Sequence, residues 1–264
     1  MTRQEIERRF RRARLSYGHG TRNAREEAAW LVSRVKDRKR LAALVERRIR
    51  ERIPLAYLLN EAWLGKHRFY VDERVIVPRS FVAELLRDRL RPWLRRPVRR
   101  ALDLCTGSGC LAVLLAKAFP RARVDASDLS ADALRVAAQN VKRYKLKKRV
   151  RLIRSDLFEK LPARYDLIVA NPPYVNAAAM ERLPKEYRHE PRSALAAGRD
   201  GLTFIRKILR EASRHLTPGG LLVCEVGAAR RALERAYPKL PFVWPKTSEP
   251  TSCVFILQCE DVSD

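Results

Sequence analysis

A four-residue stretch at 171–174, Asn-Pro-Pro-Tyr, carries residue types well suited to chemistry. It follows the apolar run Tyr165–Ala170, whose length and branched residues indicate a buried strand of a parallel sheet. Two consecutive prolines fix the backbone and remove two N–H donors while leaving the carbonyls free. We therefore expect the Asn171 side-chain oxygen and the Pro172 carbonyl to accept both N–H groups of a planar amide or exocyclic amine, with Tyr174 against the flat group. Taken alone, the stretch is equally compatible with a plain loop, because Asn-Pro and Pro-Pro are common in turns.

A glycine turn forms the second candidate site. Thr-Gly-Ser-Gly follows the expected strand Ala101–Cys105 and opens a helix, so its backbone can approach a ligand closely while the helix N-terminus faces that ligand. Asp128, at the tip of the next expected strand, is placed to accept both hydroxyls of a ribose. Gly107 and Gly109 with Ala112 also match the dinucleotide fingerprint, and Asp128 falls 19 residues after Gly109, so a nicotinamide cofactor fits this part equally well.

Residues further along the chain distinguish a nicotinamide cofactor from a nucleoside-containing methyl donor. Asp156, at the end of the third expected strand, offers a carboxylate to an adenine amino group, with Leu157 or Phe158 beside the ring; a turn or helix cap is the alternative role for Asp156. Asp103 is expected to have a structural role or to face the cationic end of a methyl donor. No Lys, Tyr or His in this set is placed to polarise a carbonyl for hydride transfer. A methyl donor with an amine acceptor fits better.

Length and composition limit the class of protein. The chain has 264 residues, 46% of them apolar, and no apolar stretch near the roughly 20 residues that span a bilayer. The first ten residues contain no apolar signal core, so we expect a cytoplasmic protein without membrane contact. The five cysteines include no C-x-x-C pair, and no His residues cluster beside them. Reduced core thiols are therefore favoured over disulfides or metal ligands, and no metal is expected.

Positive charge is concentrated in one part of the chain. Of the formal net charge of +26, residues 1–150 carry +22, from 38 Lys and Arg against 16 Asp and Glu, whereas residues 151–264 carry +4. A surplus of this size favours a polyanion such as ribosomal RNA as a partner of the basic N-terminal half, including the run 142–149. The alternative is an arginine-rich composition on solvated faces.

The helices and strands that must position the candidate site residues are expected to form three domains along the chain. Apolar residues at helical spacing predict three helices within residues 1–53, a small unit for docking a substrate or partner. Residues 54–98 are expected to connect it to the rest through a hairpin around Asp72 and Glu73 and a helix capped by Ser80. Residues 99–264 form the expected catalytic domain.

Strands and helices alternate in that last part. The pattern predicts an α/β fold with a seven-stranded, mostly parallel sheet, and its last two strands, without a helix between them, form an antiparallel hairpin. The expected strands are 101–105, 123–128, 150–156, 165–171, 220–226, 242–244 and 252–258.

Several of these stretches resemble the HemK-like protein-glutamine N5-methyltransferases, a branch of the class I S-adenosylmethionine-dependent enzymes, over nearly the whole chain. Within that family the chain is most similar to the enzymes that modify ribosomal protein L3 of the large subunit. The stretches that carry this similarity are 17–21, 60–63, 69–80, 103–110 and 186–191.

The resemblance implies a class I, Rossmann-like methyltransferase fold with a small helical N-terminal domain and S-adenosylmethionine as donor. It also implies a donor site that runs from Cys105 through Thr106, Gly107 and Ser108 to Gly109 with Asp128, and an acceptor site from Asn171 to Tyr174. The chain departs from the family at 249–255, before the last strand, where glycines are usual. This departure affects the expected shape of the final hairpin.

The expected function is methylation of a glutamine side-chain amide in ribosomal protein L3, with Asn171 near both donor and acceptor. A basic ribosomal protein would be repelled by so basic an enzyme, so a ribosome assembly intermediate is the expected substrate. Alternatives are a release-factor glutamine methyltransferase, a methyltransferase for exocyclic amines of RNA or DNA bases, and a non-catalytic assembly factor that binds ribosomal RNA. The nearly neutral half around Asn171 favours a protein acceptor.

Overall fold

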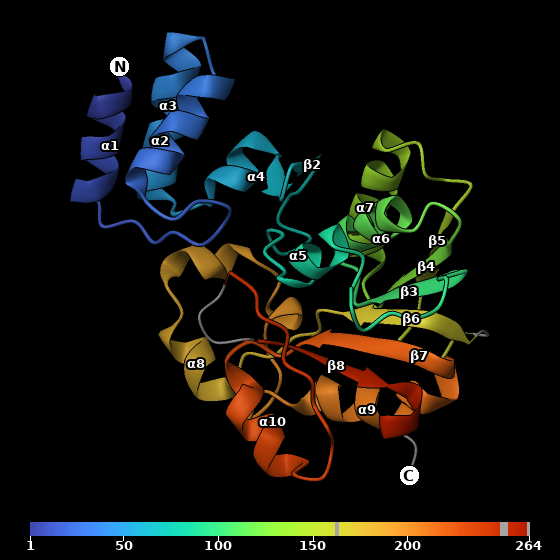
Figure 1. Cartoon of the computed structure of the whole chain (residues 1–264). Coiled ribbons are helices and arrows are strands. Elements are labelled where there is room, and N and C mark those ends of the chain that lie inside the picture. The colour runs from blue at the N-terminus through green and yellow to red at the C-terminus, as the bar shows by residue number, and fades with distance from the viewer. Residues whose placement is uncertain (162–163, 249–252, 263–264) are drawn as a thin grey trace. The chain divides into compact units, whose positions relative to one another are not determined.

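A computed structural model describes residues 1–161, 164–248 and 253–262. The chain forms two compact units, one made of Met1–Arg79 with Leu183–Pro191 and the other of Ser80–Arg182 with Arg192–Asp264 (Figure 1). The polypeptide therefore passes between the units after Arg79, Arg182 and Pro191. Within the described residues, no helix is both long and apolar enough to cross a bilayer.

The first unit is mainly helical. Its longer helices bury an apolar stripe that includes Ile6, Phe10, Leu31 and Val45, and their N-termini are capped by the side chains of Thr2, Asn23 and Asp37. The elements of this unit are α1 (Arg3–Arg12), α2 (Ala24–Arg34), α3 (Arg38–Arg50), α4 (Leu55–Leu59), β1 (Ala62–Leu64), β2 (His67–Phe69) and the 3-10 turn η1 (Lys185–His189).

The hairpin of this unit lies earlier than the sequence predicts. β1 and β2 pair antiparallel across a turn at Gly65, which has a φ of +57°, so the hairpin precedes Asp72. The Asp72 carboxylate accepts hydrogen bonds from the backbone N–H and the guanidinium of Arg74, and these bonds close a local turn instead of a hairpin end. The expectation of a hairpin around Asp72 and Glu73 is wrong.

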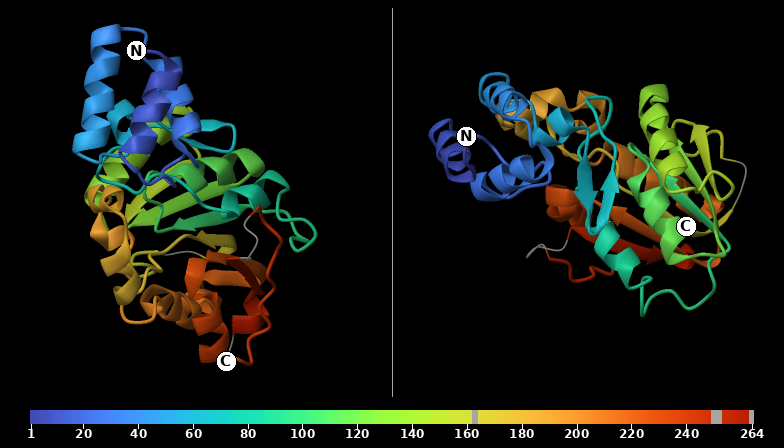
Figure 2. Two further views of the ribbon diagram at one scale, coloured as in Figure 1. Left: turned by 90° about the vertical axis from the view of Figure 1, so that its left-hand side faces the viewer. Right: turned by 90° about the horizontal axis from the view of Figure 1, so that it is seen from above.

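In the part of the chain that the structure describes, the second unit is built on a six-stranded sheet in the order β5-β4-β3-β6-β7-β8. All neighbouring strands are parallel except β7 and β8, which are antiparallel. Alternating residues of the buried strands face opposite sides, where helices cover the sheet. Figures 1 and 2 show α6 and α7 on one face and α9 and α10 on the other. The strands are β3 (Arg100–Leu104), β4 (Arg123–Asp128), β5 (Val150–Arg154), β6 (Tyr165–Ala170), β7 (Leu216–Glu225) and β8 (Val254–Gln258).

The helices of this unit follow the expected strand–helix alternation. Leu102, Ile168 and Leu222 from three adjacent strands pack against Ile205 and Ile208 in one apolar core. The helices and turns are α5 (Val82–Arg87), α6 (Cys110–Ala118), α7 (Ala131–Arg143), α8 (Ala177–Arg182), η2 (Arg192–Ala194), α9 (Thr203–His215), η3 (Gly227–Ala229), α10 (Arg230–Ala236) and η4 (Cys259–Val262).

The seventh expected strand, 242–244, is reduced to a single antiparallel bridge between Val243 and Ile256. The N–H of each of these residues donates to the carbonyl of the other. Pro241 and Pro245 stand two residues to either side, at the next positions that would have to donate to β8. Because proline has no N–H, pairing ends after one residue. The last hairpin is thus shorter than predicted, and its expected start at Ser252 lies outside the described residues.

Candidate active site

The carboxyl ends of neighbouring strands bring the two candidate sites to the same edge of the sheet. Leu104 pairs in register with Ala170 of β6, and Ala170 pairs with Cys224 of β7. The glycine turn and Asn171, which directly follow these strand ends, therefore lie on adjacent strands. Ligands bind at this edge in open α/β sheets.

Left-handed backbone marks the turn after β3. Cys105, Gly107 and Gly109 have φ values of +59°, +54° and +76°. A Cβ on Gly109 would lie 3.0 Å from the Cβ of Ala137, so this glycine allows the turn to pack closely on α7. A Cβ on Gly107 would meet no atom within 4 Å. Gly107 thus borders open space, which suits the close approach of a ligand to the backbone.

Asp103 is a fully buried carboxylate beside this turn. Its Oδ2 accepts hydrogen bonds from the Thr106 hydroxyl and from the Ala112 N–H, the latter at 2.8 Å. Its Oδ1 is buried and accepts no hydrogen bond from the described residues. Burial raises the pKa of Asp103 to about 7, although both hydrogen bonds oppose this rise. A carboxylate with an unpartnered oxygen and no ion pair to a cation of the described residues fits a positively charged group of a ligand.

Asp128 lies at the end of β4 and also contacts the glycine turn. Its Oδ2 accepts a hydrogen bond from the Gly107 N–H at 2.8 Å, and its Oδ1 accepts one from the Ser130 N–H at 2.9 Å. Burial raises its pKa against the effect of these N–H groups. Each carboxylate oxygen keeps a further acceptor position, so the predicted bonds to ribose hydroxyls are compatible with this geometry.

The candidate residues after β5 are Asp156, Leu157 and Phe158. Asp156 is half-buried, and Leu157 is 8% exposed with a φ of +45°, unusual for a residue with a branched side chain. Leu157 and Phe158 both belong to the apolar core, but Phe158 is only 2% exposed and its ring stacks on His215, with ring centroids 4.5 Å apart. Of the two residues expected beside an adenine ring, Leu157 is therefore the better candidate.

Asn171 carries an acceptor that the protein does not use. Its side-chain oxygen is buried and accepts no hydrogen bond from the described residues. The two prolines that follow are buried, which keeps the corner rigid. An unpartnered buried acceptor is costly, and such groups in folded proteins call for a ligand or a catalytic role. The Asn171 oxygen thus keeps an acceptor position that the described residues do not fill.

Tyr174 is held in place by two glycines that sequence reasoning missed. A Cβ on Gly227 would lie 2.3 Å from Cε2 of the Tyr174 ring, and a Cβ on Gly201 would lie 2.4 Å from the Tyr174 carbonyl oxygen. Both glycines have positive φ values. The position of Gly227, two residues after the end of β7 at the same sheet edge, was the available signal.

A buried glutamate completes this support. Glu225, 1% exposed, accepts hydrogen bonds from the Ser80 hydroxyl at 2.7 Å, the Phe81 N–H at 2.9 Å and the Tyr174 hydroxyl at 3.4 Å. Phe81 is the N-cap residue of α5, but the Ser80 hydroxyl oxygen accepts a hydrogen bond at 3.3 Å from the N–H of Val82, the first residue of the helix. Ser80 thus contacts the start of α5 as expected, and its hydroxyl also links this part of the unit to the end of β7.

The cysteines show no ligand geometry. All five are free, and burial raises the pKa of Cys110 to about 12. Among the described residues, no group of three or more His, Cys, Asp or Glu side chains could hold a metal ion.

Comparison with known proteins identifies the family. Residues 82–198 match the model of the methyltransferase small domain. The chain is 50% identical to the ribosomal protein uL3 glutamine methyltransferase of Neisseria meningitidis serogroup B, over 96% of this chain and 90% of that protein. The chain belongs to the uL3 glutamine methyltransferase family. The family member of Bordetella pertussis is also 50% identical, over 97% of this chain and 93% of its own length.

Solved structures support the fold of this uL3 glutamine methyltransferase family member. A methyltransferase from Pyrococcus furiosus is 19% identical and covers 84% of this chain and 98% of its own, with a TM-score of 0.53. The catalytic domain of hMettl16 is 15% identical and covers 87% and 91%, with a TM-score of 0.57. The predicted methyltransferase fold and the resemblance to the L3 branch are confirmed, although the sheet has six strands within the described residues instead of seven.

Proposed function

We propose that this protein transfers a methyl group from S-adenosylmethionine to the side-chain amide nitrogen of a glutamine in ribosomal protein uL3. The observation that carries this proposal is the buried, unpartnered oxygen of Asn171, one strand away from the glycine turn. Family membership, through relatives named for this activity, supports the same substrate.

The donor would be held by residues at the ends of three strands. Asp103 suits the positive charge of the donor, Asp128 its ribose hydroxyls, and Asp156 with Leu157 its adenine. When bound, S-adenosylmethionine supplies a methyl group on a cationic sulfur. The backbone from Cys105 through Thr106, Gly107 and Ser108 to Gly109 would border it, since Gly107 faces open space.

The acceptor amide needs orientation rather than a strong base. Its nitrogen is a poor nucleophile because its lone pair is delocalised. Asn171 Oδ1 and the Pro172 carbonyl would each accept one N–H, which aligns the nitrogen, and alignment of this kind contributes roughly 7–11 kcal/mol. Tyr174, held by Gly227, would lie against the flat amide. The surplus proton would leave to water.

The docking partner in this proposal is an assembly intermediate rather than free uL3. The net charge of +22 on residues 1–150 would repel a basic protein and attract ribosomal RNA. Residues 1–53 would dock the particle, 54–98 would connect, and 99–264 would perform the chemistry. A ribosomal substrate would place the reaction in the cytoplasm.

Mass spectrometry tests this function. The protein is incubated with S-adenosylmethionine and either free uL3 or ribosome assembly particles, and a gain of one methyl group on a uL3 glutamine is expected. Release factor and bare ribosomal RNA serve as competing substrates, and labelled methyl is followed through protease and ribonuclease digestion. Label released by ribonuclease, or a gain on release factor alone, would contradict the proposal. Methylation of the free protein at the same rate as of the particle would contradict the docking partner.

A further inference from the structure

The opposite edge of the sheet, where β3, β4 and β5 begin, contains a groove of about 400 Å³. Asp125 is the one carboxylate among the residues that line it. The cations that line it are Arg100, Arg123, Lys147, Lys148, Arg149 and Arg151.

Strand register explains how these cations gather. Arg100 at the start of β3 pairs directly with Arg123 at the start of β4. Lys147 and Lys148 belong to the turn that leads into β5, the next strand of the sheet. Like charges on paired residues of adjacent strands are destabilising. Their accumulation at one edge is thus a cost that an anion would relieve.

The protein neutralises part of this charge. Arg151 forms a bidentate salt bridge with Asp125, with both N···O distances at 2.9 Å. The Tyr165 hydroxyl also donates a hydrogen bond to this carboxylate at 2.9 Å. Arg149 donates to the Ala116 carbonyl at 2.8 Å and so stabilises the C-terminal end of α6.

Four cations remain exposed at the groove. Arg100, Arg123, Lys147 and Lys148 form no ion pair with any carboxylate in the described part of the chain, and all four are exposed. Arg100 lies over the Tyr165 ring, 5.9 Å from its centroid. The groove therefore offers four charges from three successive elements.

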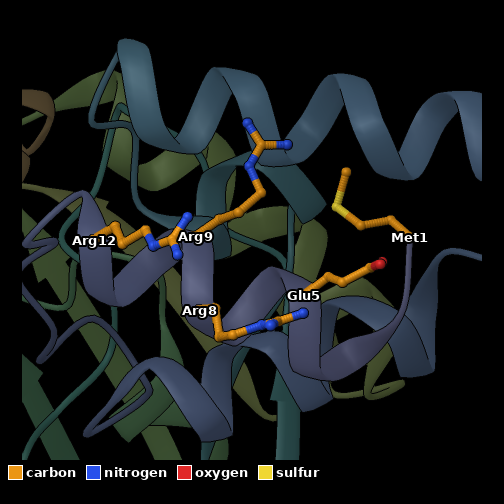
Figure 3. A pocket seen from close by; sticks show the side chains of 5 residues that line it. All are labelled: Met1, Glu5, Arg8, Arg9 and Arg12. Carbon is orange, nitrogen blue, oxygen red and sulfur yellow. The ribbon is translucent and has the colours of Figure 1, made fainter.

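A second arginine-lined hollow provides a contrast. Met1, Glu5, Arg8, Arg9 and Arg12 line it, all from the first twelve residues of the chain (Figure 3). Arg9 is paired with Glu46, and Glu5 closes the capping box of α1 with Thr2. Each of the two hollows is thus lined by one carboxylate, but this one has fewer cations without an ion pair among the described residues than the groove.

We propose that the groove at the amino-terminal edge of the sheet binds phosphate groups of RNA. Arginine matches phosphate geometry with two donors, and lysine adds point charge. The apolar lining residues, Val124 and Val150, are 1% and 5% exposed, so the groove offers neither an apolar pocket for peptide side chains nor an aromatic ring for bases. It contacts the RNA backbone without reading its sequence.

The choice of RNA over another polyanion rests on the proposed function, in which the substrate is presented with ribosomal RNA. A strand of five or six residues spans roughly 17–20 Å, so RNA in this groove lies a strand length from Asn171. RNA there is a tether that holds the particle and is not the methyl acceptor.

Salt-dependent RNA binding tests the proposal. The triple variant Arg123→Ser, Lys147→Ser, Lys148→Ser is compared with Arg231→Ser, Arg235→Ser, Lys239→Ser, which removes equal charge from exposed positions on and after α10. Binding of a short fluorescent ribosomal RNA fragment is followed by anisotropy over a series of KCl concentrations. The groove variant is expected to lose about two to three from the slope of log affinity against log salt, since each phosphate contact contributes about 0.7–0.9. The α10 variant is expected to retain the slope.

Equal losses in both variants, or unchanged slope in the groove variant, would overturn the proposal. Displacement of the RNA by polyglutamate of equal charge and concentration would overturn it in favour of an acidic protein partner. Calorimetric affinity for S-adenosylmethionine confirms that each variant is folded. RNA binding is measured without methyl transfer, so the two proposals are tested separately. If uL3 is not methylated, the comparison of the salt slopes remains valid. If the salt slopes do not differ, the methylation result remains valid.

Discussion

Two buried glutamates of the helical unit and two aspartates at the carboxyl ends of the strands have opposite environments. In the helical unit, Glu190 accepts two hydrogen bonds from the Arg79 guanidinium at 2.6 Å and one from the Val77 N–H at 2.9 Å. Glu186 accepts from the Ser16 N–H at 2.9 Å and lies 3.3 Å from Nη1 of Arg48. Although burial opposes it, these partners lower the pKa of both acids, that of Glu190 to about 2.

At the carboxyl ends of the strands, Asp103 and Asp128 form no ion pair with a cation of the described residues. Burial raises the pKa of Asp103 and of Asp128, and Asp103 keeps an oxygen without a hydrogen bond. The difference separates two uses of buried charge. Removing one partner of a buried ion pair destabilises the fold, whereas a buried acid with an oxygen that accepts no hydrogen bond is a candidate for contact with a ligand.

Removing Glu190 should have the largest effect. Glu190→Ala removes the buried carboxylate that accepts two hydrogen bonds from the Arg79 guanidinium, and we expect a loss of about 3–5 kcal/mol in the free energy of unfolding at pH 7. Because the pKa of Glu190 is lowered, its contribution is complete above about pH 5 and is lost as the pH falls toward about 2. Urea denaturation at several pH values measures this.

Glu46→Ala in the same unit is the control, since its pair with Arg9 is exposed and is expected to contribute less than about 1 kcal/mol. Equal destabilisation by both variants would contradict the distinction between complete buried pairs and surface pairs.

Removing the unpartnered acceptor should affect chemistry and leave stability intact. Asn171→Ala is expected to lower kcat by about 10²–10³-fold, an effect comparable to losing one positioned hydrogen bond in a transition state, while donor affinity persists. Single-turnover methyl transfer and calorimetry measure the two quantities. Asn176→Ala, which removes only a hydrogen bond to the Ala179 N–H, is the control. Parallel loss of donor binding in Asn171→Ala would count against its role toward the acceptor.

Displacing Tyr174 should have a smaller effect. Gly227→Ala places a methyl group 2.3 Å from the Tyr174 ring, so the ring must move, and we expect a 10- to 100-fold loss in kcat. Gly219→Ala imposes a similar positive φ, but its Cβ would meet only the Arg96 guanidinium at 3.6 Å. This control separates backbone strain from displacement of the ring. If Gly227→Ala is equally harmful in a Tyr174→Ala background, the ring is not the reason.

The smallest expected effect is a pH dependence of donor binding. Because the pKa of Asp103 is about 7 and a cationic ligand favours its ionised form, donor affinity should fall about tenfold per pH unit below pH 7 and level off above it. Without donor, the stability that this group contributes is present below its unfolded pKa near 4 and is lost as the pH rises through about 7. Calorimetry from pH 5 to 8 tests the first point. Asp103→Asn should abolish the slope, and a variant with the wild-type slope would exclude Asp103 as its source.

The sequence predicts best what is local. Strand ends, the glycine turn and the position of Asn171 all follow from patterns within a few residues, and the structure places them at one edge. The support of Tyr174 was not predicted, because Gly201, Gly227 and Glu225 meet it only through the fold. Pro241 and Pro245 were a signal that the seventh strand would not form. Their effect could not be predicted, however, because it depends on which residues must donate a backbone N–H to β8.

The place of residues 183–191 was equally hidden. No helix or strand was predicted for this segment from the sequence, yet Glu186 pairs with Arg48, 138 positions away, and Glu190 pairs with Arg79, 111 positions away. Charge pairing over such distances has no periodic signal in the sequence. The segment folds with the N-terminal helices because its acids have their cations there.

The interleaving of the two units has a practical consequence for dissecting this enzyme. A truncated chain that begins at Ser80 would lack the N-terminal helices but would still contain Leu183–Pro191. Glu186 and Glu190 would then have lost the arginines with which they form ion pairs. If such a fragment were inactive, the loss of these ion pairs would explain the result as well as a loss of substrate recognition. Swapping helical parts between relatives would therefore require exchanging that nine-residue segment together with them.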